Sequence, residues 1–208
     1  MCYNLESSII ALVIGWTSAY LMFKRNKKFD LFFYPLLFTF SFMQLAEALM
    51  WYDTGCGILN KIGGYIGYFS LSSHALAQGI SLYLINKNII GILIGLLSIS
   101  YLTYKLPKID CSKKIKHIEW GFDSGFYRWI YILTVGIAAI TNIGWKYKLI
   151  IIGWYTFTWL YFYHKQYNIK KLNYIFDGTE LTNQFASAWC HISALSAPFI
   201  YLLGSINF

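Results

Sequence analysis

The sequence predicts an all-α fold, a polytopic membrane protein built as a bundle of about seven transmembrane helices. Two observations support this prediction. The chain contains successive apolar runs of roughly 16–23 residues that are nearly free of charge, which is the length a helix needs to cross a bilayer. The 208 residues are 57% hydrophobic and only 12% charged, whereas soluble domains carry about 25% charged residues.

The expected helices follow the apolar runs, and residues 1–208 form one transmembrane domain. Tryptophan and tyrosine sit at many run ends, as in interfacial aromatic belts. Pro35 falls near the start of the second run, where proline does least harm, and a glycine-rich link over 53–64 precedes the third. Some runs are short for a bilayer, so six or eight spans remain alternatives. The runs lie at about 7–23, 31–51, 65–85, 89–104, 127–143, 148–163 and 183–203.

The net charge of +8 indicates a lipid surface as the partner. The basic residues lie in the connections between apolar runs, where they anchor to headgroups and set topology. No groove pattern of stacked aromatic and basic residues accompanies them, so we expect no nucleic-acid partner.

The orientation of the chain follows from two conflicting signals. A count of all basic residues favours an N-terminus inside, whereas the compact basic cluster of residues 24–28 favours an N-terminus outside, because the loop after the first span usually dominates. Cys56 and Cys111 fall in loops on the N-terminal side, where an oxidising compartment would allow a disulfide; free thiols are the alternative. We expect an extracytoplasmic N-terminus.

The third run carries a continuous stripe of small and polar residues on one helical face. Residues three and four apart share a side of a helix. Such a stripe is typical of helix–helix packing in membranes, which is one interpretation of its serines. An ionisable histidine inside a membrane is a functional candidate by default. The stripe consists of Gly67, Ser70, Ser73, His74, Ala77, Gln78 and Ser81.

The second and last runs repeat this pattern. Gln44 and Glu47 share a face of the second run, and Glu47 is the only acid well inside a span. Pro198 is expected to kink the last run and free a carbonyl near Ala194. We expect a polar pocket between the second, third and last helices, open toward the N-terminal side. The face of the last run carries Asn183, Ser187, Cys190, His191, Ala194 and Pro198.

Three chemistries fit this set of side chains. Glu47, His74 and His191 are candidate ligands of a zinc ion, with Cys190 as a spare, although no established metal-ligand spacing accompanies them. The same acid and histidines are the groups that proton and cation pathways use. The third interpretation is a hydrogen-bonded network that fixes helix register. A serine nucleophile is disfavoured, because no motif activates Ser70 or Ser73.

Two family resemblances fall on these residues. The segments Met1-Cys2-Tyr3, Gln44-Leu45-Ala46-Glu47 with Trp51, and Trp189-Cys190 resemble an uncharacterised family of multi-pass bacterial membrane proteins. That family typically opens Met-Cys-Phe-Ser-Ala and has Gln-Leu-x-Glu and Trp-Cys motifs. The resemblance implies a seven-helix fold without a known activity. It carries over Cys2, Gln44, Glu47, Trp51, Trp189 and Cys190.

The second resemblance is to the alkaline ceramidase superfamily of seven-helix zinc hydrolases. Ser70 and His74 are similar to its third-helix serine-to-histidine spacing, and Trp189 with His191 resembles its last-helix pattern. The resemblance implies a zinc cofactor. Ser187 stands where that family has a further histidine, so a zinc site here would use Glu47 or Cys190.

The sequence thus ranks three functions. We expect first a non-enzymatic membrane protein that passes a proton, an ion or a small ligand through the pocket. The alternatives are a zinc-dependent intramembrane hydrolase and a structural membrane protein of a virion or organelle.

Overall fold

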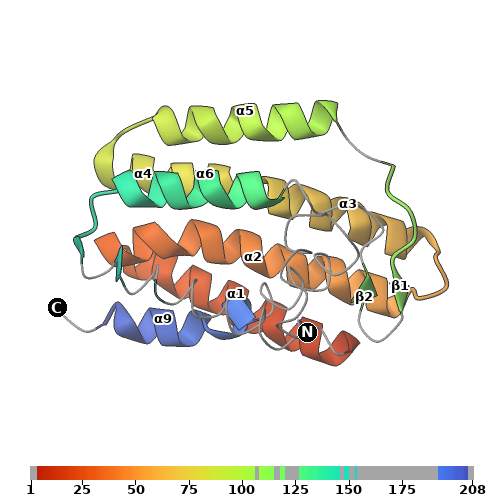
Figure 1. The fold of residues 1–208 in the computed structure, drawn as a ribbon. Coiled ribbons are helices and arrows are strands. Elements are labelled where there is room, and N and C mark those ends of the chain that lie inside the picture. Colours follow the sequence, from red (N-terminus) through yellow and green to blue (C-terminus); the bar gives the residue numbers. More distant parts are fainter. Residues whose placement is uncertain are drawn as a thin grey trace, which may run out of the picture.

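The computed structural model describes residues 4–105, 108–114, 118–119, 127–145, 148–149, 153 and 192–205. Helices dominate this part of the chain, with one short antiparallel pair of strands (Figure 1). Most of the expected helix 148–163 and residues 183–191 of the last expected helix lie outside these ranges. The elements are α1 (Leu5–Arg25), α2 (Lys28–Tyr52), α3 (Ile58–Ser72), α4 (His74–Asn86), α5 (Ile90–Tyr104), β1 (Lys113–Lys114), β2 (Ile118–Glu119), α6 (Tyr127–Ile140) and α9 (Ala197–Leu203).

The first two helices form an antiparallel hairpin, and their ends are set by local chemistry. Asn4 caps α1, because its side-chain oxygen accepts a hydrogen bond from the Ser7 backbone N–H at 2.8 Å. Asn26 ends α1 in the left-handed region, with φ 56° and ψ 29°, a conformation that asparagine tolerates. The Asp30 carboxylate then accepts the Lys27 backbone N–H at the start of α2. Both helices match the expected ranges 7–23 and 31–51 to within a few residues.

The expected third helix, 65–85, differs from the structure at both its start and its centre. Helix α3 begins at Ile58, inside the segment expected to be a glycine-rich link. Its glycines serve close packing, since a Cβ on Gly63 would lie 2.7 Å from the Ala46 carbonyl oxygen of α2. At Ser73 the helix is interrupted and α4 begins at His74. Ser73 has φ −84° and ψ −6°, still in the right-handed helical region, so the interruption is a local distortion at one residue.

Helices α4, α5 and α6 build the next layers (Figure 1). A Cβ on Gly79 of α4 would overlap the backbone of Gly91 of α5, so the two helices touch through their main chains. Helix α6 packs on α4, and α5 lies outermost. The expected ranges 89–104 and 127–143 match α5 and α6, except that α6 ends at Ile140.

The last described segment shows the expected interruption near Pro198. Residues 192–195 are helical, Ser196 is a turn, and α9 begins at Ala197 with Pro198 in its first turn. Proline has no N–H to bond the Ala194 carbonyl, which is why the helix is interrupted upstream of it. Helix α9 packs against α1.

A disulfide joins the loop after α2 to the segment after α5. Cys56 and Cys111 are bonded, with their Cα atoms 5.2 Å apart. Beside them, the Asn60 side chain exchanges two hydrogen bonds with the backbone of Ser112, at 2.8 and 3.0 Å. The structure therefore favours the bonded alternative over free thiols. This loop lies at the same end of the bundle as the start of α1 (Figure 1).

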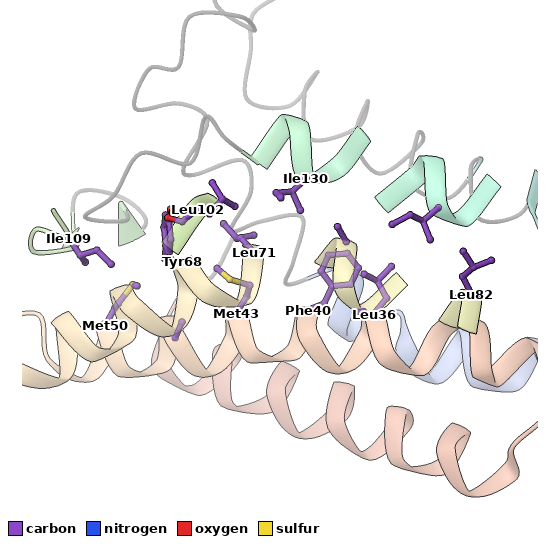
Figure 2. Close-up of a cluster of buried hydrophobic side chains, with 14 residues drawn as sticks. Leu36, Phe40, Met43, Met50, Tyr68, Leu71, Leu82, Leu102, Ile109 and Ile130 are labelled. Carbon is purple, nitrogen blue, oxygen red and sulfur yellow. Dashed lines mark hydrogen bonds between the residues drawn. The ribbon is translucent and has the colours of Figure 1, made fainter. Parts of the chain in front are cut away.

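The main apolar cluster lies between α2 and the helices α3, α4 and α6. Figure 2 shows Leu36, Phe40 and Met43 of α2 pointing toward Leu71 of α3 and Ile130 of α6. Each of these side chains is at most 3% exposed. The cluster fixes how α2 lies against α3 and α4, and so positions the polar residues beside it.

Large apolar side chains cover much of the outer faces of α1 and α5. On α1 the buried side chains are small ones such as Ala11 and Gly15, whereas Ile10 and Val13 are 55% and 57% exposed. On α5, Gly91 and Gly95 are buried, and large aliphatic side chains cover the exposed face. Helices α1 and α2 are both long and apolar enough to cross a membrane.

Candidate functional site

The polar side chains of α2 gather on one buried face. Gln44 and Glu47 are both 0% exposed, and they are three residues apart, so they share this face with Phe40. Apolar residues on both sides of this stripe pack into the two core clusters of the bundle. The α2 sequence therefore carries an amide and a carboxylate into the protein interior, where they require polar surroundings.

Helix α4 contributes the second half of the site. The His74 ring is 1% exposed and meets the Phe40 ring edge-on, with the ring centroids 4.3 Å apart. Gln78 lies one helical turn further along the same face and is 0% exposed. The interruption at Ser73 places His74 at the very start of α4.

The register between these helices is fixed by two serine contacts. Ser81 donates a hydrogen bond to the Phe32 carbonyl at 2.9 Å, and Ser70 donates to the Thr39 carbonyl at 2.6 Å. Residue numbers therefore increase along α2 in the direction in which they decrease along α3 and α4. Helix α2 runs antiparallel to both α3 and α4.

This register orders the four buried polar residues along the bundle. Glu47 lies about 10 Å along the axis from Phe40, and Gln78 lies about 6 Å beyond His74 in the opposite direction, at 1.5 Å of rise per residue. Along the bundle axis the order is therefore Glu47, Gln44, His74 and Gln78. We call these four residues the polar column. It is an extended line rather than a compact cluster.

The serines of the expected pocket have structural roles. Besides the Ser70 bond to α2, the half-buried Ser73 donates to the Ser70 carbonyl at 2.7 Å. Ser72 donates to the Tyr68 carbonyl at 2.8 Å. Such bonds from serine to helix carbonyls loosen the helix, which accounts for the interruption at Ser73. They agree with the packing interpretation of these serines.

The proposed metal ligands are only partly placed. Glu47 and His74 belong to the polar column, whereas Ser187, Cys190 and His191 lie outside the described residues, as do Cys2 and Trp189. Within the described ranges, no group of three or more His, Cys, Asp or Glu side chains is arranged to hold a metal ion. The zinc set therefore stays a prediction.

One buried charged cluster was not anticipated from the sequence. Arg25 and Asp30 form an ion pair between the end of α1 and the start of α2. The Arg25 guanidinium also donates to the Tyr201 carbonyl at 2.8 Å and to the Ser205 hydroxyl, and it lies 4.1 Å from the centroid of the Tyr201 ring. A lone acid directly after a basic cluster was the available signal, but the pairing with the C-terminal segment needs the fold.

Comparison with known proteins found no matching family model and no similar curated protein or solved structure. The two family resemblances of the sequence therefore stay predictions.

Proposed function

We propose that this chain is a multi-pass integral membrane protein and that its polar column carries a proton or a small cation. The observation that supports the proposal is the combination of two features. A line of buried carboxyl, amide and imidazole groups runs inside the bundle, and the exposed faces of the surrounding helices are apolar. In water this distribution is costly on both counts, whereas in lipid the apolar exterior is the expected one.

The outer face of α1 supports the membrane placement. A core helix of a soluble protein is mostly buried. Only a third of the most apolar stretch of α1 is buried, and its large side chains point outward. Helices α3 and α4 follow one another with only Ser73 between them, so together they are long enough for a third crossing. Seven spans is the count that we propose.

The roles within the column follow from the chemistry of its members. Glu47 is the group that gains and loses a proton or binds the cation, because it is the carboxylate of the column. His74 is the relay, since an imidazole accepts a proton on one nitrogen and releases one from the other. Gln44 lies between them along the axis and offers an amide oxygen and two N–H donors.

The test is proton flux into vesicles that contain the purified full-length chain. With a potassium gradient and valinomycin driving uptake, a pH-sensitive dye inside the vesicles reports the rate. We expect Glu47→Gln, which keeps the shape of the side chain and removes its charge, to lower the rate at least tenfold. Glu6→Gln, at an exposed acid on α1, is the matched control and should leave the rate unchanged.

The same preparation separates the alternatives. The flux of protons, sodium and potassium is measured in turn. Flux into wild-type vesicles that is no faster than flux into protein-free vesicles, for all three ions, would rule the proposal out. Zinc bound in stoichiometric amount and lost in His74→Ala would favour the hydrolase alternative instead. Variants of Glu47 and His74 that change only thermal stability would favour a structural role.

A further inference from the structure

Neither polar atom of the Gln78 side chain has a hydrogen-bond partner among the described residues. Its side chain is 0% exposed, and both its amide nitrogen and its amide oxygen lack a hydrogen bond to any described residue. A buried primary amide offers two donors and accepts at its oxygen. Leaving all of these hydrogen bonds unmade is strongly unfavourable, so a partner other than the described residues is expected.

The neighbouring hydroxyl groups do not supply that partner. Ser81, one turn away on the same face of α4, donates its proton to the carbonyls of Phe32 and Ala77, at 2.9 and 3.2 Å. Across the interface, α4 and α6 meet where a Cβ on Gly91 would touch both Leu82 and Ile137. Asn142, just after α6, also lies beside Asn86 at the end of α4, so the two helices run in the same direction. Gln78 and the residue one turn before Ile137 therefore lie at a similar position along the bundle axis.

That α6 residue is Thr134, and its hydroxyl is also committed. It is buried and donates to the Ile130 carbonyl at 2.7 Å. The hydroxyls of Ser81 and Thr134 therefore both donate their only proton to helix carbonyls. The amide oxygen of Gln78 then needs a donor that the described side chains around it do not provide.

The surroundings also limit the size and the depth of that partner. On the side away from His74, α4 carries the buried Ser81, whose proton is already donated, and the buried Leu82. Ile137 of α6 lies beside Leu82 at Gly91, and both side chains belong to the apolar cluster. Apolar groups of this kind offer no hydrogen bond to a polar molecule. An occupant at Gln78 is thus small, both donates and accepts, and goes no deeper.

We propose that Gln78 is a water-binding site at the inner end of the polar column. One or more water molecules bound to its amide extend the polar column past His74 by one helical turn and stop at Leu82 and Ile137. This inference deepens the proposed function and rests on it, because water at Gln78 gives the proton or cation a place to reside beyond His74. It also makes that apolar contact the barrier to passage.

The experiment uses silver ions, which are small enough to follow a line of water and bind thiolates tightly. Gln78→Cys and Leu82→Cys are compared in vesicles containing the full-length chain, in nitrate buffer. Both positions are 0% exposed and lie one turn apart on α4. After silver exposure the protein is denatured and alkylated, and mass spectrometry of the peptide gives the fraction of each thiol that silver protected, independently of the native cysteines.

We expect the thiol at position 78 to be protected at least tenfold faster than the thiol at position 82. Equal rates at the two positions, whether both slow or both fast, would overturn the inference. A second variant covers the case in which Gln78→Cys does not fold. Gln78→Met keeps the length of the side chain, and it should lower the melting temperature if bound water is lost; an unchanged or raised value would show that the amide was simply unsatisfied.

Failure of this inference is distinguishable from failure of the proposed function. If silver reaches position 78 but the protein shows no flux, the water site is supported and the proposed passage of a proton or cation is contradicted. If Glu47→Gln abolishes flux but silver does not reach position 78, the passage is supported and the water site is contradicted.

Discussion

The guanidinium of Arg25 and the carboxylate of Asp30 meet in a two-point ion pair across the turn that joins α1 to α2. The Nε–Oδ2 distance is 2.8 Å, and Nη2 donates to the other carboxylate oxygen. The Asp30 side chain is 0% exposed and the Arg25 side chain 15% exposed. Because Arg25 also binds Tyr201 and Ser205, this pair ties the C-terminal helix to the first hairpin.

Asp30→Asn should destabilise the protein strongly. It removes the charge that compensates a mostly buried guanidinium, and loss of one partner of a buried pair costs about 3–5 kcal/mol. Denaturant unfolding of the purified chain in detergent measures this change. Asp110→Asn is the control, because Asp110 pairs with Lys108 at 66% and 89% side-chain exposure, and an exposed pair contributes about 1 kcal/mol or less. Equal losses in the two variants would contradict the assignment.

Gly79→Ala should separate α4 from α5. A single Cβ at this position would overlap the carbonyl group of Gly91, which is backbone and has no rotamer by which to move aside. We expect a loss of about 1–3 kcal/mol, the usual range for overpacking. Gly136→Ala on α6 provides the comparison, since no described atom outside the adjoining backbone of α6 lies within 4 Å of the added carbon. Alanine there should stabilise the helix by up to about 1 kcal/mol. In thermal unfolding, Gly79→Ala should lower the melting temperature and Gly136→Ala should raise it.

Loss of the Cys56–Cys111 disulfide should lower stability by about 4 kcal/mol in the chain-entropy description, because the bond closes a long loop. The two cysteines are 55 residues apart in the sequence. Cys111→Ser without reductant, compared with wild type with and without reductant, measures the effect. Identical unfolding curves in all three samples would show that the bond does not form.

The end of the bundle that carries this disulfide should face the oxidising side of the membrane. The opposite end carries the basic cluster at residues 24–28 and Lys87, as expected for a cytoplasmic face. In intact cells a membrane-impermeant maleimide should label Glu6→Cys and leave Asn88→Cys unlabelled, relative to the wild-type background. Both positions are exposed and lie at opposite ends of the bundle. The reversed pattern would place the N-terminus inside.

The sequence predicts helices well where an apolar run begins and ends in charge. Helices α1 and α2 follow their runs closely, because Asn4 and the basic cluster at residues 24–28 mark the ends. The prediction is wrong at the start of α3, because Gly63 and Gly64 lie inside the helix and not in a link. In lipid, glycine is tolerated in a helix when a neighbouring backbone fills the space, and Ala46 does so here. That information is tertiary, and a single sequence does not contain it.

The candidate site was predictable in its composition and less so in its shape. Helical periodicity alone places Gln44 with Glu47 and His74 with Gln78, and burial agrees. Their order along the bundle depends on the register of Ser81 against Phe32 and of Ser70 against Thr39, which the sequence leaves open. The Arg25 cluster was missed for the same reason, since Tyr201 and Ser205 are distant in the chain.

The hydroxyl groups of the buried faces have a consequence for the sign of any charge that enters. Ser41, Ser70, Ser81, Thr134 and Thr141 each donate their proton to a helix carbonyl. What they present to their surroundings is therefore oxygen lone pairs, which attract protons, ammonium groups and metal cations and give an anion nothing to bind. In this chain of net charge +8, these five hydroxyls therefore make their immediate surroundings more favourable for a cation than for an anion.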